Sequence, residues 1–291
     1  MTKIKLSIWA LTLVFLAILS QNSRASGTYY RPGSSASGKY SSLKKGELRA
    51  GVRADFQRYS QERLFNGIHA RVAEVRLRTY TLFTEYGLTQ NSSVYVAIPY
   101  VDNDSDAKNS PDYAPEQGLG DMKIGFNKFF PLRKNTVLIG TGEATVPLRN
   151  YKTTKLTAYG ENSVDFLTHL ALRGDSIAGT PLFYSVGAGG KLRASKAPDQ
   201  WLWDAELGGR LGSSASLSTF LDSIDSGHGT TLGGPSFNGD FAQLKQGLTR
   251  WGFRAQFNLG TVGGELYYAK AIRYQNQSPS DYYGLSILGR F

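Results

Sequence analysis

The stretch ELRAGVRADFQ, residues Glu47–Gln57, alternates strictly between two kinds of side chain. One face is apolar and consists of Leu48, Ala50, Val52, Ala54 and Phe56. The other is mainly charged or polar and consists of Glu47, Arg49, Gly51, Arg53, Asp55 and Gln57. Successive side chains of a β-strand point to opposite sides of the sheet. The stretch therefore predicts a strand with one apolar and one strongly charged face.

The same period of two recurs along the chain. In Ala73–Phe83, we assign the odd-numbered positions to the apolar face and Glu74, Arg76, Arg78 and Tyr80 to the polar face. Alternation of this kind, bounded by turn residues, indicates β-strands. The predicted strands are 46–58, 69–86, 93–101, 118–130, 136–147, 163–173, 181–193, 201–212, 215–222, 247–258, 262–274 and 281–291.

These strands predict a membrane barrel. After residue 25, no apolar run approaches the ~20 residues of a membrane helix. A sheet in lipid must close on itself, because an open edge leaves backbone groups unsatisfied. Composition alone, with 33 Gly, 17 Tyr and 15 Phe, also suits a soluble β-sandwich. We therefore expect from the alternation an all-β fold, a transmembrane antiparallel up-and-down β-barrel of about twelve strands.

The beginning of the chain predicts export. Lys3 and Lys5 precede the apolar run Leu6–Leu19, and Ser23-Arg24-Ala25 offers a small-residue cleavage site. These features indicate a signal peptide at 1–25. An uncleaved anchor helix is the alternative, but the run is short for one. Residues 26–45 predict a flexible periplasmic segment, with a short plug as the alternative, and residues 46–291 the barrel. The expected location is the bacterial outer membrane.

Connection lengths and the last strand support this location. Short and long connections alternate, as periplasmic turns and outer loops do, so both ends of the barrel lie on the periplasmic side. The longest connection, 223–246, is rich in Gly, Ser and Asp. The chain ends with Tyr283, Leu285, Ile287, Gly289 and Phe291 on one face. This ending resembles the C-terminal aromatic signal of outer-membrane proteins, which implies the insertion machinery and outer-membrane lipid as partners.

Charge and cysteine content exclude several kinds of partner. The chain carries +10, and its signal holds three basic and no acidic residues, so the rest carries 10 − 3 = +7. The basic residues are spread out and the chain is exported, so we expect no nucleic-acid partner. No cysteine is present, which excludes disulfides and thiolate metal sites. We expect no cofactor.

Catalytic and metal motifs are incomplete. A barrel phospholipase places a serine two residues from a histidine. The residues at that spacing after His69, His169 and His228 are Arg71, Ala171 and Thr230. We therefore expect no enzyme, and a barrel hydrolase is only a distant alternative. Asp102–Asp106 begins like a calcium loop but lacks the Gly and Glu that complete one, so we expect no metal site.

The charged faces supply candidates for the lining of a pore. They are Glu47, Arg49, Arg53, Asp55, Glu74, Arg76, Arg78, Glu143, Asp165, Asp204, Glu206, Arg210, Arg250, Arg254, Glu265 and Arg273. In one interpretation these side chains line a wet passage and select solutes. In the other they pair across strands and fill a closed lumen. Twelve strands lie between barrels just filled by side chains and open porins, so both interpretations stand.

Three short motifs carry a family resemblance. They are EYGLTQNSSVYVAIPY at Glu85–Tyr100, GLGDMKIGFNKFF at Gly118–Phe130 and GEATVP at Gly142–Pro147. Together they resemble the putative MetA-pathway of phenol degradation family. The resemblance implies an outer-membrane barrel that helps small hydrophobic or aromatic compounds cross. It also implies turn and strand-start roles for Gly87, Gly118, Gly120 and Asp121.

Two functions follow from the sequence. The first is a channel or transporter for passive passage of small molecules, aromatic or hydrophobic compounds among them. The second is a non-transporting barrel with a plugged lumen, acting as a surface-loop adhesion or structural protein. The arginines assigned to the inner face of the first hairpin argue against a purely apolar solute.

Overall fold

The computed structural model describes residues 43–63, 69–106, 115–133, 135–149, 163–194, 197–230, 234–236, 243–275 and 279–291. The expected signal peptide at 1–25 lies outside the described residues, as do 26–42 of the next segment and residues 231–233 and 237–242 of connection 223–246. Within the described part of the chain there is no helix long and apolar enough to cross a membrane.

The described chain consists almost wholly of β-strands. They are β1 (Leu48–Arg63), β2 (His69–Thr89), β3 (Ser92–Ser105), β4 (Glu116–Leu119), β5 (Asp121–Arg133), β6 (Thr136–Pro147), β7 (Asp165–Gly174), β8 (Leu182–Arg193), β9 (Gln200–Leu211), β10 (Ala215–Ser226), β11 (Gly247–Leu259), β12 (Val262–Gln275) and β13 (Asp281–Arg290).

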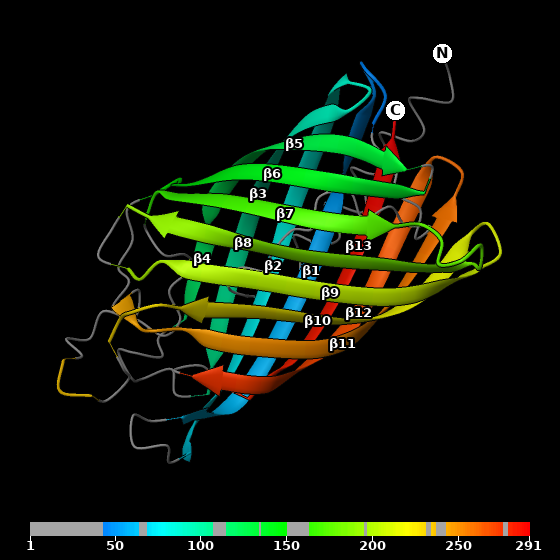
Figure 1. Cartoon of the computed structure of the whole chain (residues 1–291). Coiled ribbons are helices and arrows are strands. Elements are labelled where there is room, and N and C mark those ends of the chain that lie inside the picture. The colour runs from blue at the N-terminus through cyan, green and yellow to red at the C-terminus, as the bar shows by residue number, and fades with distance from the viewer. Residues whose placement is uncertain are drawn as a thin grey trace, which may run out of the picture.

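The thirteen strands form one closed antiparallel sheet (Figure 1). β4 and β5 both pair with β3, one after the other, so together they occupy one strand position in the barrel wall. The barrel therefore has 13 − 1 = 12 strand positions. β1 closes the barrel by pairing with β13 on one side and β2 on the other. Figure 1 shows β5 to β9 in front and β1, β2 and β13 behind. The predicted up-and-down barrel is confirmed.

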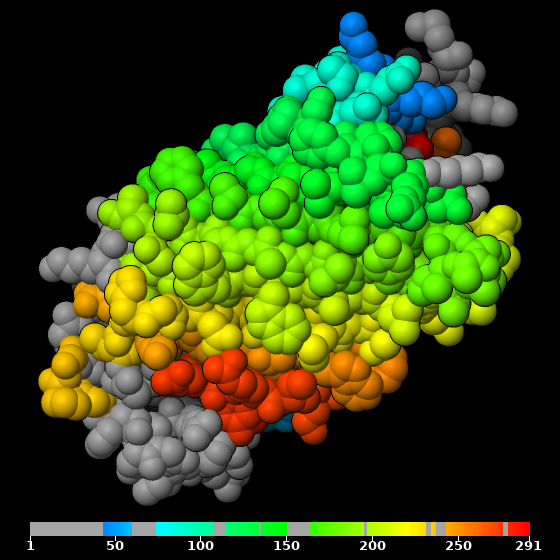
Figure 2. All heavy atoms as spheres, in the orientation of Figure 1, coloured from blue at the N-terminus to red at the C-terminus, as the bar shows by residue number. Residues whose placement is uncertain are grey.

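The outer surface is apolar because one row of each strand carries large hydrophobic side chains. Exposed examples are Phe126, Phe166, Leu192, Trp201 and Leu266. Figure 2 shows the wall over β5 to β11 as a closely packed surface. A closed barrel with an apolar outside fits lipid, since every strand pairs and no backbone edge is left open. The chain is therefore an outer-membrane β-barrel.

The two ends of the barrel differ. Two residues separate β2 from β3, and two separate β5 from β6. These short turns lie at the same end of the barrel as the start of β1 and the end of β13. The last residue, Phe291, exchanges two backbone hydrogen bonds with Leu48, at 2.8 and 3.0 Å. By the usual asymmetry of such barrels this is the periplasmic end, and the opposite end faces outside. β1 and β2 are long and run on toward the outside.

β3 is longer than the sequence predicts. It continues to Ser105 because Asn103 and Ser105 pair with Leu77 and Val75 of the long β2. The predicted acidic segment Asp102–Asp106 is therefore mostly strand and not a loop.

Candidate functional site

The inner wall of the barrel is the candidate site, because it gathers most of the charged candidates. The inward rows of the strands hold Arg49, Arg53, Asp55, Glu143, Asp165, Asp204, Glu206, Arg210, Arg250, Arg254 and Glu265. Glu47 comes just before β1 and lies 3.6 Å from Arg290. Each strand reaches this arrangement through period-two alternation, so the sequence places these side chains on the correct face.

The predicted inward direction of Glu74, Arg76 and Arg78 is wrong. In the structure Val75 and Leu77 are buried inside, at 0% and 5% exposure, and the even-numbered residues of β2 face outward. Arg78 pairs with Phe56 and shares the outer face with the exposed Leu82. The alternation is correct but the faces are exchanged. This part of β2 lies at the outer end, where charged side chains meet water and headgroups rather than lipid tails.

The predicted inward direction of Arg273 is also wrong. β12 contains a bulge: Arg250 pairs with Ala271 and Thr249 with Arg273, so Ile272 is an extra residue. A bulge shifts the alternation by one position. Arg273 therefore lies on the outer row, 61% exposed, where it binds Asp225 at 2.9 Å.

A network of alternating charges crosses the inner wall from β1 to β9. The Arg254 guanidinium forms an ion pair with Glu206 at 2.7 Å and lies 3.2 Å from Glu265. Arg53 donates to Asp55 at 2.9 Å and lies 3.7 Å from Glu265. Glu265 thus joins two arginines. Each buried charge faces opposite charges, which offsets the cost of removing it from water.

Aromatic rings complete this part of the wall. The Tyr267 hydroxyl donates to Asp55 at 2.7 Å, and the Arg53 guanidinium lies 5.1 Å from the centre of the Tyr267 ring. Arg254 lies 4.6 Å from the Phe220 ring in the same way. Such positions allow cation–π attraction, which is stronger where water is excluded. The inner wall therefore offers planar cations stacked on aromatic faces.

A third arginine repeats the arrangement nearer the outer end. Arg250 donates two hydrogen bonds to Asp222, each of 2.9 Å, and lies 4.7 Å from the Tyr282 ring. A bidentate guanidinium–carboxylate pair fixes both side chains.

The wall around β2, β3 and β5 contains residues that the sequence analysis missed. Glu85 is 1% exposed, pairs with Arg49 and accepts a hydrogen bond from Ser93. Tyr95 of β3 was also missed, and its hydroxyl donates a 2.6 Å hydrogen bond to the predicted Glu143 of β6. The signal for Glu85 was available: it follows Phe83 at a spacing of two, on the row that faces inward. The exchanged faces of β2 hid it.

The wall around β7 to β9 holds two further groups of charges. His169 Nε2 lies 2.8 Å from Asp204. Asp165 is paired with Lys191 at 2.7 Å and lies 3.5 Å from Arg193. Lys191 and Arg193 were also missed. They lie at the outer end of β8, after a glycine-rich stretch without charged residues.

Several inward rings lie flat over a glycine of the next strand. An added Cβ at Gly125 would overlap the Tyr95 ring, and one at Gly284 would overlap the Tyr267 ring. Glycine supplies the space for a cross-strand ring to lie against the wall rather than project into the lumen. Glycines on the inner face therefore set how far these rings reach.

The arrangement is suited to binding or passing solutes. The inward carboxylates are buried, with Asp55 2%, Asp165 1% and Glu206 7% exposed, and each has a basic or hydroxyl partner. Such pairing is expected for a lumen filled by side chains. In an open lumen, a solute would meet the same carboxylates and their partners. Within the described ranges, no cluster of three or more His, Asp or Glu side chains forms a metal site.

Comparisons with known proteins support the fold. No protein-family model and no curated protein matches the chain. Among solved structures, the COG4313 outer membrane channel from Pseudomonas putida F1 matches with 16% identity, 90% coverage of this chain, 100% of that chain and a TM-score of 0.70.

Two further structures match less well. The NanC porin has 10% identity, 82% and 98% coverage and a TM-score of 0.50. The translocator domain of the autotransporter NalP from Neisseria meningitidis has 12% identity, 86% and 90% coverage and a TM-score of 0.50. At such identities the likeness concerns the fold. The chain shares the β-barrel fold of outer-membrane proteins.

Proposed function

We propose that this protein is an outer-membrane channel through which small molecules pass passively, and that it belongs with the putative MetA-pathway of phenol degradation barrels. The Pseudomonas putida protein of similar fold is named an outer membrane channel, which supports the proposal. The observation that carries it is the inner wall, where arginines lie over aromatic rings, as Arg53 over Tyr267 and Arg254 over Phe220.

This wall favours solutes with an aromatic ring and a polar or anionic group. A ring finds partners in the wall's aromatic side chains and guanidinium planes. A carboxylate or phenolate finds arginines. Arg76 and Arg78 lie on the outer face of the barrel, so they do not oppose the entry of an apolar solute. Arg49 and Arg53 remain inside.

The test is permeation through the purified full-length barrel in liposomes, with benzoate, phenol, glucose and an aliphatic acid of similar size. Folded protein is verified by its heat-modifiable migration on gels. We expect benzoate and phenol to pass faster than glucose, and Arg254→Gln together with Glu206→Gln and Glu265→Gln to reduce the preference for benzoate. A folded barrel that passes none of the four solutes contradicts the proposal.

The second candidate is a non-transporting barrel. The observation that favours it is the complete pairing of buried inner carboxylates such as Asp55 and Asp165. Planar-bilayer recording separates the candidates. Steady openings by folded protein support the channel, and silence at all voltages supports the non-transporting barrel.

A further inference from the structure

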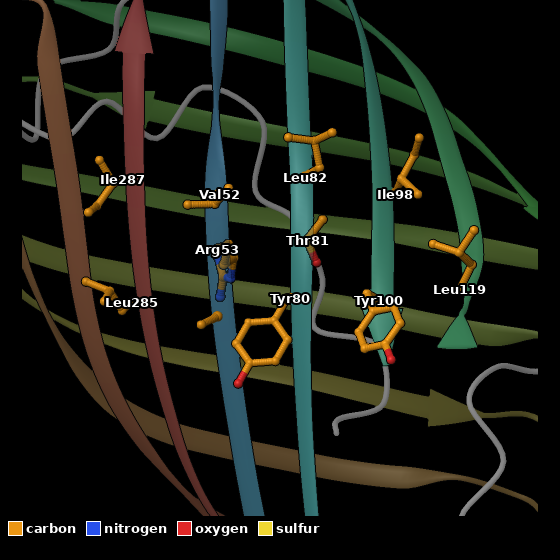
Figure 3. Close-up of a pocket in the computed structure, with 11 residues that line it drawn as sticks. Val52, Arg53, Tyr80, Thr81, Leu82, Ile98, Tyr100, Leu119, Leu285 and Ile287 are labelled. Carbon is orange, nitrogen blue, oxygen red and sulfur yellow. The ribbon is translucent and has the colours of Figure 1, made fainter. Parts of the chain in front are cut away.

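The outer wall of the barrel is hollowed over β13, β1, β2, β3 and β4 (Figure 3). The hollow has a volume of about 240 Å³. Val52, Leu82 and Ile98 line it from three neighbouring strands that pair in register. These residues lie on outward rows, so the hollow opens toward the membrane and not toward the lumen.

The hollow exists because small side chains lie between large ones. Ala54 of β1 pairs with Tyr80 of β2, and Tyr80 pairs with Tyr100 of β3. Figure 3 shows the two tyrosine rings side by side, beyond Leu82 and Ile98. Because β1 runs outward from Val52 to Ala54, the tyrosines lie on the outer side of the hollow. Tyrosine is typical of the level at which lipid tails meet headgroups.

Arg78 is the next outward residue of β2 after Tyr80, and it is partly buried. Its neighbour Arg76 is held by Glu74 at 2.8 Å and Asp106 at 3.1 Å. By contrast, no described residue forms a side-chain hydrogen bond or ion pair with Arg78, although the buried Asp102 is its cross-strand neighbour on β3. A partly buried guanidinium beside an apolar hollow, at the headgroup level, fits an anionic ligand. Guanidinium binds phosphate especially well, through two parallel hydrogen bonds.

We propose that this surface binds one phosphorylated glycolipid of the outer leaflet, the lipid A part of lipopolysaccharide. One acyl chain lies in the hollow past Ala54 and Val52, and one phosphate lies at Arg78. The headgroup must lie at the outer end of β2, where Arg78 is, which selects an outer-leaflet lipid over the phospholipids of the inner leaflet. The site is on the opposite side of the wall from the lumen and is independent of what passes through it.

The two halves of the site contribute differently. An acyl chain gains little free energy when it moves from contact with other acyl chains into the hollow, because the two environments are equally apolar. The hollow therefore supplies shape, and the phosphate contact supplies the preference for one lipid. We expect loss of Arg78 to weaken binding more than a change in the hollow does.

The test uses the full-length folded barrel in mild detergent, with lipid retention measured by native mass spectrometry. The probes are bisphosphorylated lipid A, the same glycolipid without phosphates, and phosphatidylglycerol. Arg78→Gln removes the phosphate contact, and Ala54→Phe fills the hollow. Arg133→Gln is the matched control, because it removes an exposed arginine at the periplasmic end of β5.

We expect the unaltered barrel and Arg133→Gln to retain lipid A equally. Arg78→Gln should retain at least five-fold less, and Ala54→Phe about two-fold less. If Ala54→Phe fails to fold, the Arg78→Gln comparison and the dephosphorylated probe still decide. Equal retention by Arg78→Gln and the unaltered barrel overturns the proposal. So does phosphatidylglycerol bound as well as lipid A, or lipid A bound equally with and without its phosphates.

Discussion

Tyr267 lies flat against the inner wall because its partner on β13 is Gly284. A methyl group at position 284 would overlap the ring and force it off the wall, away from its hydrogen bond with Asp55. We expect Gly284→Ala to lower the free energy of unfolding by about 1–3 kcal/mol, as overpacking does. Urea titration in lipid vesicles measures this. Gly142→Ala is the control, because no atom lies within 4 Å of its Cβ. Equal effects of the two changes would contradict the packing argument.

Arg254 is the residue on which the central charge network depends. Among the residues that the structure describes, it is the one that contacts both Glu206 and Glu265 through short ion pairs. Arg254→Met leaves two buried carboxylates without their main cation, and breaking a buried pair in this way costs about 3–5 kcal/mol. Adding Glu206→Gln and Glu265→Gln should restore most of the lost stability, since no unpaired charge then remains. Urea titration checks both variants. An Arg254→Met barrel as stable as its parent would mean that these carboxylates are solvated.

At the scale of the strand, the sequence predicts alternation well and direction less well. The predicted bounds of β6, 136–147, agree with the structure, and those of most other strands differ by few residues. The predicted inward row is wrong at two places, where the apolar row does not face lipid or the alternation is interrupted. In the outer part of β2, beyond the lipid tails, the apolar side chains face the interior of the barrel. On β12 the extra residue Ile272 moves Arg273 to the opposite face. Neither the height of a residue in the membrane nor a bulge is visible in the alternation of a single strand.

The direction of the outer part of β2 is testable, because the chain has no cysteine. We expect Arg76→Cys to react quickly with a membrane-impermeant maleimide added to intact cells, since its side chain is 39% exposed on the outer face. Leu77→Cys should be protected, because Leu77 is 5% exposed and faces the interior. Labelling is read as a mass increase of the purified barrel. The reverse order of reactivity would return Arg76 to the inner face.

At the scale of the whole molecule, the partner of each inward side chain can be identified only once the sheet is closed. Arg49 meets Glu85, and Tyr267 meets Asp55 from the far end of the chain. Alternation predicts Arg49 and Asp55 as inward charges, but it does not give the register between strands. Ion pairs, cation–π contacts and rings seated on glycines all follow from that register. For this reason the candidate wall was predictable as a set of residues and not as a network.

Closure of the barrel gives Phe291 a structural role, and its aromatic ring is the predicted signal for the insertion machinery. Phe291 exchanges two backbone hydrogen bonds with Leu48, while its ring is exposed on the outer face. In Phe291→Ala the backbone bonds remain and only the aromatic signal is lost. We expect a several-fold smaller folded fraction in outer membranes of cells, measured by heat-modifiable migration, with Phe291→Tyr close to the parent. Refolding of the purified Phe291→Ala chain into detergent should be unchanged, since the β1–β13 register is intact. If the refolding yield in detergent fell as much as the folded fraction in cells, the ring would be needed for closure of the barrel. Recognition by the insertion machinery would then not explain the loss in cells.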